Sequence, residues 1–226
     1  MGHMRIARER LLEGAARAEG VVIVVDVIRA FTTAAFALSA EPRELRLFST
    51  VSKALAAKER EPTAFLMGEE GGAPPAGFDH GNSPALLPVE SVRGRTVFQR
   101  TGSGTRCAVA AERATHVYGA SLVVAGATAR AVAGLSPSLV TIVESGGAEE
   151  GDDAVADHLE GLLRGGAPPL SGTLRRVREC PAAREIIEGG RSHSPPQDIA
   201  CCLAVDFFDF AIQVERGPSG VFARRD

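Results

Sequence analysis

The sequence predicts an α/β fold, in which a largely parallel central sheet lies between two layers of helices in a three-layer sandwich. One observation is that short apolar segments alternate with longer segments of helical periodicity along most of the chain. The other is the segment 21–26, VVIVVD, which is a nearly continuous β-branched run. Such a run is typical of a strand that is buried on both faces because helices cover both sides of a parallel sheet.

The chain is expected to begin with a helix over 7–20, because this segment is amphipathic and ends at a glycine. The strand 21–26 follows, and then a helix over 30–40. A strand over 45–48 precedes a Ser/Thr cap and a helix over 51–60. The further strands are expected over 64–67, 96–99, 115–120, 139–145 and 210–214, and the further helices over 102–113, 121–135 and 153–163.

The length of 226 residues is enough to bury the core of one large domain or of two closely packed halves. We expect this domain to span 5–226, with residues 1–4, MGHM, left over from an expression tag. The longest loops are expected over 71–90 and 165–172. The sequence leaves open whether the protein forms a homodimer.

The composition excludes several classes of function. A net charge of -3 provides no basic surface for nucleic acid. No apolar run approaches the length of about 18 residues that a membrane-spanning helix needs, so no membrane partner is expected. The four cysteines form no C-x-x-C pair, so we expect free thiols and a location in the reducing cytoplasm.

Polar and glycine-rich loops follow four of the expected strands. They are DVIRAFTT from Asp26, GEEGG from Gly68, RTGSGT from Arg100 and ESGGAEEGDD from Glu144. In open parallel sheets, ligands bind beyond the carboxyl ends of the strands. We therefore expect these loops to form the functional site.

The four loops together supply carboxylates, hydroxyl groups, glycines and arginines, which suit a hard cation beside a phosphate group. Mg²⁺ takes one or two carboxylates and completes its shell with water and phosphate oxygens. Glycine-rich turns can bring backbone N–H groups to an anion, and arginine offers a forked donor. The competing interpretation is that these residues are the ordinary caps and turns of an α/β protein.

Several common phosphate-binding motifs are missing from the sequence. It contains no G-x-x-x-x-G-K-[ST] and no G-x-S-x-G. The segment GSGTRCA, 102–108, departs from G-x-G-x-x-G at Cys107. A P-loop enzyme, a dinucleotide-binding enzyme and an α/β-hydrolase are therefore not predicted.

A resemblance to the 2-phosphosulfolactate phosphatase (ComB) family of coenzyme M biosynthesis is carried by four segments, which occur in this order: VVDVIRAFTT, GEEGGAPPAGFDHGNSP, RTGSGTRC and GDDAVAD. The similarity extends over about 21–214, and GFDHGNSP is its most specific part. It implies an α/β fold, dependence on Mg²⁺, and hydrolysis of 2-phosphosulfolactate to sulfolactate and phosphate.

The resemblance, together with the loop positions, gives the candidate site residues. Asp26, Glu69 and Asp152 are the candidate metal ligands and catalytic residues. Asp26 is expected to be required for turnover and to contribute little to folding, although a helix N-cap is an alternative role. The candidate substrate-binding residues are Arg29, Thr33, Gly71, Gly72, Asn82, Ser83, Thr101, Ser103, Gly104 and Thr105.

Three segments depart from the family pattern. Glu70 replaces the arginine of G-E-R-G-G, TGSGT at 101–105 replaces T-T-N-G-T, and Gly151-Asp152 replaces a Glu-Asp pair, of which only Asp152 carries over. The leading hypothesis is a Mg²⁺-dependent phosphatase acting on a small acidic phosphate monoester. The alternatives are a non-catalytic metabolite-binding homologue and a phosphatase of altered substrate specificity.

Overall fold

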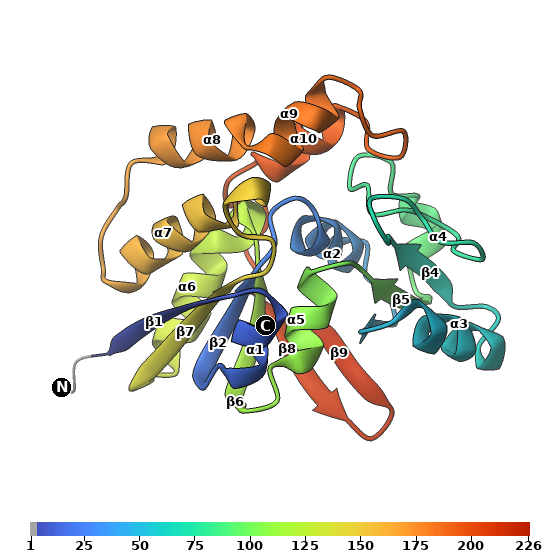
Figure 1. Ribbon diagram of the computed structural model, residues 1–226. Coiled ribbons are helices and arrows are strands. Elements are labelled where there is room, and N and C mark those ends of the chain that lie inside the picture. The colour runs from blue at the N-terminus through green and yellow to red at the C-terminus, as the bar shows by residue number, and fades with distance from the viewer. Residues whose placement is uncertain (1–3) are drawn as a thin grey trace.

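The computed structural model describes residues 4–226, which contain a nine-stranded sheet of order β1-β7-β2-β6-β8-β9-β3-β5-β4 (Figure 1). The expected tag remnant at 1–4 therefore lies outside the described residues, apart from Met4. The strands are β1 (Arg5–Arg10), β2 (Gly20–Val25), β3 (Glu44–Phe48), β4 (Phe65–Gly68), β5 (Thr96–Arg100), β6 (Ala114–Ala120), β7 (Leu139–Glu144), β8 (Ile212–Gly217) and β9 (Gly220–Arg225). The α-helices are α1 (Leu11–Arg17), α2 (Ala30–Ser39), α3 (Val51–Arg60), α4 (Val89–Val92), α5 (Gly104–Ala110), α6 (Ala125–Gly134), α7 (Asp152–Leu163), α8 (Leu170–Glu179), α9 (Pro181–Ile187) and α10 (Gln197–Cys202). Short 3₁₀ helices span Leu122–Val124 and Gly147–Glu150.

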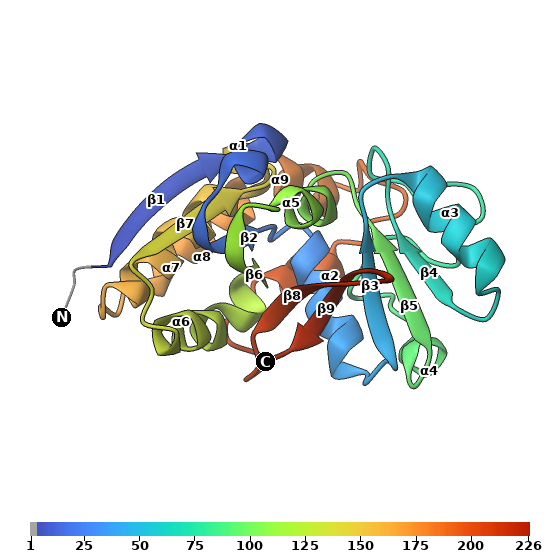
Figure 2. The ribbon, with the colours of Figure 1, turned by 90° about the horizontal axis from the view of Figure 1, so that it is seen from below.

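Strand β2 shows why helices cover both faces of the sheet. Its side chains alternate between the two faces, because successive Cβ atoms of a strand point in opposite directions. Val22 and Val24 join a core with residues of α1, α2 and α5, whereas Val21, Ile23 and Val25 join a second core with residues of α6 and α7. Figure 2 shows α1 and α5 on one side of these strands and α6 and α7 on the other. The predicted three-layer α/β fold is confirmed.

The sheet is largely parallel, with antiparallel pairings in its middle. The pairs β6–β8, β8–β9 and β9–β3 are antiparallel, whereas the pairs on either side of them are parallel. In a flat sheet, the carboxyl ends of β2 and β5 would therefore lie at opposite edges. They meet because the sheet twists and curls from β1 to β4 (Figures 1 and 2). Gln99 of β5 donates from Nε2 to the carbonyl of Ala30 in α2 across 3.0 Å, which joins these two ends.

The helix predicted over 7–20 is confirmed only for α1, and its first part is wrong, because that part belongs to the edge strand β1. This strand pairs in parallel with β7, from Arg5 opposite Leu139 to Arg10 opposite Glu144. Its side chains are exposed or half-buried, so its sequence lacks the apolar run of a central strand. Leu11, with φ 57°, turns the chain from β1 into α1. Backbone pairing with β7 thus decides the structure of a segment whose side-chain pattern favours a helix.

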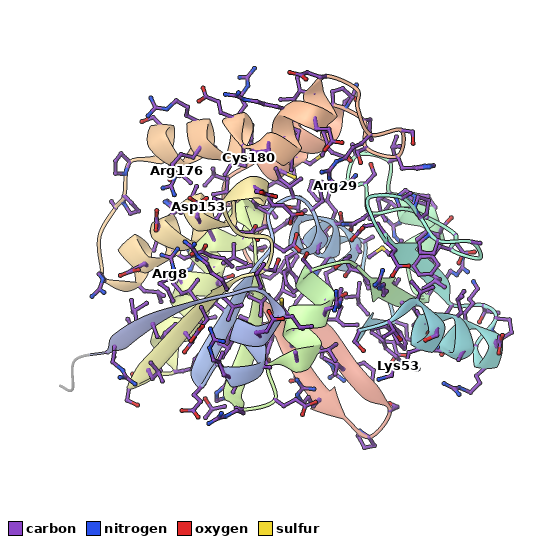
Figure 3. All side chains as sticks on the ribbon, in the orientation of Figure 1. Arg8, Arg29, Lys53, Asp153, Arg176 and Cys180 are labelled. Carbon is purple, nitrogen blue, oxygen red and sulfur yellow. The ribbon has the colours of Figure 1, made fainter. Side chains whose placement is uncertain are left out.

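Helices α8, α9 and α10 lie above the carboxyl ends of β2 and β7 (Figure 1) and were not predicted. They cover 170–202, a region in which the sequence analysis placed only a loop over 165–172. Ion pairs run along the outer surface from α8 to β1 (Figure 3). Arg176 of α8 binds Asp153 and Asp157 of α7 at 2.5 and 2.7 Å, and Arg8 of β1 binds Asp157 at 2.9 Å. Because these pairs are partly exposed, they contribute little to stability. They connect α8, α7 and β1 along the surface.

All four cysteines are free thiols, as expected from their spacing. Helices long and apolar enough to cross a membrane are absent from residues 4–226.

The packing of α2 on the sheet depends on a glycine. Phe31 of α2 is fully buried, and its ring lies against Gly119 of β6, where an added Cβ would come within 2.2 Å of the ring. We predict that Gly119→Ala lowers the free energy of unfolding by about 1–3 kcal/mol, because the core is already filled.

A matched control is Gly134→Ala in α6, where an added Cβ would meet nothing within 4 Å. This change should leave stability unchanged or raise it by up to about 1 kcal/mol. Chemical denaturation of both variants provides the measurement. If Gly119→Ala is as stable as Gly134→Ala, this account of α2 packing is contradicted.

Candidate functional site

A cavity of about 570 Å³ opens where the loops after β2, β4, β5 and β7 meet the end of α9 and the chain that follows it. Its volume lies in the range of small-molecule sites. Eight of the predicted site residues line it, namely Asp26, Arg29, Glu69, Gly71, Gly72, Asn82, Thr101 and Ser103. The other five, Thr33, Ser83, Gly104, Thr105 and Asp152, lie behind this lining.

Asp26 follows β2 directly and is 3% exposed. Its Oδ1 accepts the backbone N–H of Ala30 at 2.7 Å, and its Oδ2 accepts the hydroxyl of Ser145 at 2.9 Å. Burial raises the pKa of this carboxyl; the bonds from Ala30 and Ser145 oppose that effect, and the charge of Glu69 adds to it. These contacts join α2 to the end of β7, and they do not support the expectation that Asp26 contributes little to folding.

The position of Gly104 explains why this residue has no side chain. An added Cβ would lie 2.6 Å from Oδ2 of Asp26 and 2.8 Å from the Cβ of Ala30. The loop after β5 can therefore approach β2 only with glycine here. Gly104 was predicted to bind substrate, but the structure places it between the loop and Asp26, away from the cavity.

Glu69 joins two of the cavity loops. Its Oε2 accepts the backbone N–H of Gly72 at 2.9 Å, and its Oε1 accepts that of Gly102 in the loop after β5. Gly71 and Gly72 have φ angles of 62° and 85°, which glycine adopts without strain. The neighbouring Glu70 turns outward, where its carboxylate, 63% exposed, binds Arg100 at 2.8 Å.

Asp152 is fully buried, and both of its oxygens are occupied by the protein. Its Oδ1 accepts the N–H of Val27 at 2.9 Å, and its Oδ2 accepts the N–H of Gly146 at 2.8 Å and the hydroxyl of Ser145 at 3.3 Å. Burial, followed by the charges of Asp26 and Glu150, raises the pKa of this carboxyl well above its ordinary value. Asp152 thus fixes the loops after β2 and β7 from behind the cavity.

Glu150 lines the cavity in the position that the sequence analysis gave to Asp152. Burial, and then the charges of Asp26 and Glu69, raise its pKa to about 8. Between the two acidic residues, Gly151 adopts a left-handed conformation with φ 77° and reverses the chain. The glycine in the sequence EEGD was the only signal for this turn, and it does not show which carboxylate faces the cavity.

A buried network holds Arg29 at the cavity wall, between α2 and α10 (Figure 3). Its Nη1 binds Oδ2 of Asp198 at 2.6 Å. The other oxygen of Asp198 accepts the hydroxyl of Ser83 at 2.6 Å and the N–H of Ala85 at 3.1 Å. Asp198 belongs to α10 and was missed because that helix was not predicted. Ser83, a predicted substrate-binding residue, instead supports Arg29 through this network.

Two further contacts, of Thr33 with Asn82 and of Thr105 with Thr101, show similar support of lining residues. Thr33 donates from its hydroxyl to the carbonyl of Asn82 at 3.2 Å, and Asn82 leaves its buried Oδ1 without a partner among residues 4–226. Thr105 accepts the N–H of Thr101 at 2.8 Å, and Thr101 accepts the N–H of Thr105 at 3.1 Å. Thr33 and Thr105 therefore position their neighbours, while Asn82 and Thr101 face the cavity.

The charged side chains of the cavity wall are mostly acidic. Asp26, Glu69, Glu150 and Glu185 provide carboxylates, whereas Arg29 and Arg191 provide guanidinium groups. Within residues 4–226, no group of three His, Cys, Asp or Glu side chains is arranged to hold a metal ion unaided. The donor set is nevertheless of the type that Mg²⁺ uses, because this ion needs only one or two carboxylates beside water and ligand oxygens.

Comparison with known proteins agrees with the resemblance seen in the sequence. The family model for 2-phosphosulpholactate phosphatase matches residues 7–165. A probable 2-phosphosulfolactate phosphatase of Bacillus subtilis is 29% identical over 197 residues, which are 86% of each chain. Those of Thermus thermophilus and Deinococcus radiodurans are 45% and 42% identical over 127 residues, which span 56% of this chain and about half, 53%, of each relative. The chain therefore belongs to the 2-phosphosulfolactate phosphatase family, which is a family of phosphoric monoester hydrolases.

Proposed function

We propose that the protein is a Mg²⁺-dependent phosphatase that hydrolyses a small acidic phosphate monoester, and that 2-phosphosulfolactate is its substrate. The observation that carries this proposal is the meeting of Asp26 and Glu69 in one cavity. They come from strands that run in opposite directions along the sheet, yet their carboxylates face the same space beside Arg29. Family membership supports the reaction class.

The charge of the cavity supports the requirement for a cation. Its four carboxyl groups outnumber its two guanidinium groups, and the mutual repulsion of neighbouring carboxylates helps to raise the pKa values of Asp26 and Glu150, so a bound cation would favour their ionised forms. Asp26 and Glu69 would hold Mg²⁺, and Glu150 is the third carboxylate of the same wall. When bound, the metal supplies charge neutralisation of phosphoryl oxygens and a lowered pKa of a coordinated water.

The chain's own residues would bind and orient the substrate. Thr101 and Ser103 present hydroxyl groups to phosphoryl oxygens, and Gly71 and Gly72 let the substrate come close to the backbone. Nη1 of Arg29 donates to Asp198 and to the carbonyl of His193, whereas its Nε and Nη2 make no hydrogen bond within residues 4–226 and are free for an anion. Positioning and charge stabilisation supply most of the catalysis of phosphoryl transfer, so a site without a cysteine nucleophile is adequate.

The alternative of a non-catalytic homologue is less well supported by the geometry. It rests on the changed GEEGG and RTGSGT loops, and above all on the added carboxylate of Glu70. That carboxylate points away from the cavity and binds Arg100 instead.

The free thiols support our further proposal that the reaction takes place in the reducing cytoplasm.

Two adjacent glutamates allow a matched test of the proposed site. Glu69→Gln should reduce Mg²⁺-dependent phosphate release from 2-phosphosulfolactate by about 100-fold or more, equivalent to about 2.7 kcal/mol of transition-state stabilisation. Glu70→Gln should change the rate by less than about threefold, because the carboxylate of Glu70 is exposed and does not line the cavity. Steady-state kinetics of both variants, with circular dichroism as a folding control, provide the measurement. Equal rates for the two variants would count against Glu69 as a site residue.

The buried pair of Arg29 and Asp198 predicts a separation of stability from activity. Asp198→Asn should lower the free energy of unfolding by about 3–5 kcal/mol, because it leaves Arg29 buried and unpaired. The double variant Arg29→Gln, Asp198→Asn removes both charges, so it should recover much of the stability and none of the turnover. Denaturation and phosphate release measure the two properties. Recovery of both would show that Arg29 serves only the fold.

A further inference from the structure

The segment that covers the cavity contains residues with no role in the site described so far. We call residues 185–193 the roof segment; it comprises the end of α9 and part of the loop before α10. Glu185, Gly190, Arg191, Ser192 and His193 all line the cavity. The roof segment lies beyond residue 165, where the match to the family model ends. It therefore brings side chains to the site that the matched region does not contain.

Arg191 is the cation of the roof segment, and it lies beside the GEEGG loop. An added Cβ at Gly72 would be 4.0 Å from the Cδ of Arg191, so the aliphatic part of the arginine passes next to that loop. The guanidinium group thus enters the same cavity as Glu69 from the roof segment, next to the GEEGG loop.

The hydrogen bonds of Arg191 leave most of its donors free. Its Nε binds Glu185 at 2.8 Å, and within the described chain its two Nη atoms make no hydrogen bond or ion pair. The Glu185 side chain is 49% exposed, so the pair is weak and easily exchanged for another anion. Arg29 differs, because its charge is matched by the fully buried Asp198.

The cavity suits a substrate that carries two acidic groups. A cation held by Asp26 and Glu69 would accommodate the phosphate group, and the free Nη donors of Arg191 in the roof segment are available to the second acid. Arginine binds the planar carboxylate and the sulfonate through paired N–H donors.

We propose that Arg191 is the specificity-determining residue that binds the second acidic group of the substrate, a carboxylate or a sulfonate. This inference rests on the proposed function for the identity of the first group, the phosphate. It assigns no part in bond cleavage to Arg191. The arginine selects phosphate esters that carry an additional acid over simple alkyl phosphates.

The test compares the binding of two probes that the enzyme cannot hydrolyse. The first is a phosphonate in which a methylene group replaces the ester oxygen of 2-phospholactate. The second is the same phosphonate with a methyl group in place of its carboxylate. Titration calorimetry with Mg²⁺ present should show that the wild-type protein prefers the first by about 10- to 100-fold, the gain expected from a charge-assisted hydrogen bond.

Arg191→Gln should reduce that preference by about tenfold or more and leave the affinity for the methyl probe almost unchanged. Arg184→Gln is the matched control, because Arg184 is exposed on α9 and does not line the cavity. A sulfonate in place of the carboxylate distinguishes the two acids. If Arg191→Gln keeps the wild-type preference, or if the wild-type protein has none, the proposal is overturned. Hydrolysis of 2-phosphosulfolactate by the same preparations tests the proposed function separately.

Discussion

The carboxylate of Asp26 joins the two parts of the curled sheet, and the geometry of the cavity depends on this contact. It accepts hydrogen bonds from the start of α2 and from Ser145 after β7, and Gly104 of the loop after β5 packs against it. A buried carboxylate needs such donors because its desolvation is costly. The hydrogen bonds that allow Asp26 to be buried thus connect the loops after the parallel strands β2 and β7, and the packing of Gly104 adds the loop after β5, a strand that runs in the opposite direction.

The close placement of acidic groups in the cavity is unfavourable for stability and useful for function. Asp26 and Glu150 both have raised pKa values, for which burial is the main cause and neighbouring acidic groups contribute. Such a cluster is unfavourable for the fold alone and is typical of functional sites. A cation would relieve the repulsion and give the cavity an affinity for phosphate. Arg29 is held in place from behind by Asp198, whereas Arg191 comes from the roof segment and keeps free donors.

The sequence predicted the layers of the fold and the loops of the site because both follow local patterns. The β-branched run of β2 and the polar loops after β2, β4 and β5 are examples. The strand β1 was misassigned because only its pairing with β7 distinguishes it from a helix. The sequence analysis placed Asp152 in the cavity wall, but Glu150 lies there instead, because the turn at Gly151 reverses the chain between them. Asp198 and Arg191 lie far along the chain from the loops that they meet, so local patterns could not connect them.

The central claim is that Asp26 and Glu69 hold a divalent cation that receives a phosphate group. A crystal structure of the protein with Mn²⁺ and inorganic phosphate tests it most directly, because anomalous scattering locates the metal independently of the surrounding atoms. The account predicts an anomalous peak within coordination distance of a carboxylate oxygen of each residue, at about 2.1 Å as for Mg²⁺, with phosphate bound to the metal beside Thr101 and Ser103. Phosphate bound in the cavity with no metal at Asp26 or Glu69, or metal bound only elsewhere, would contradict it.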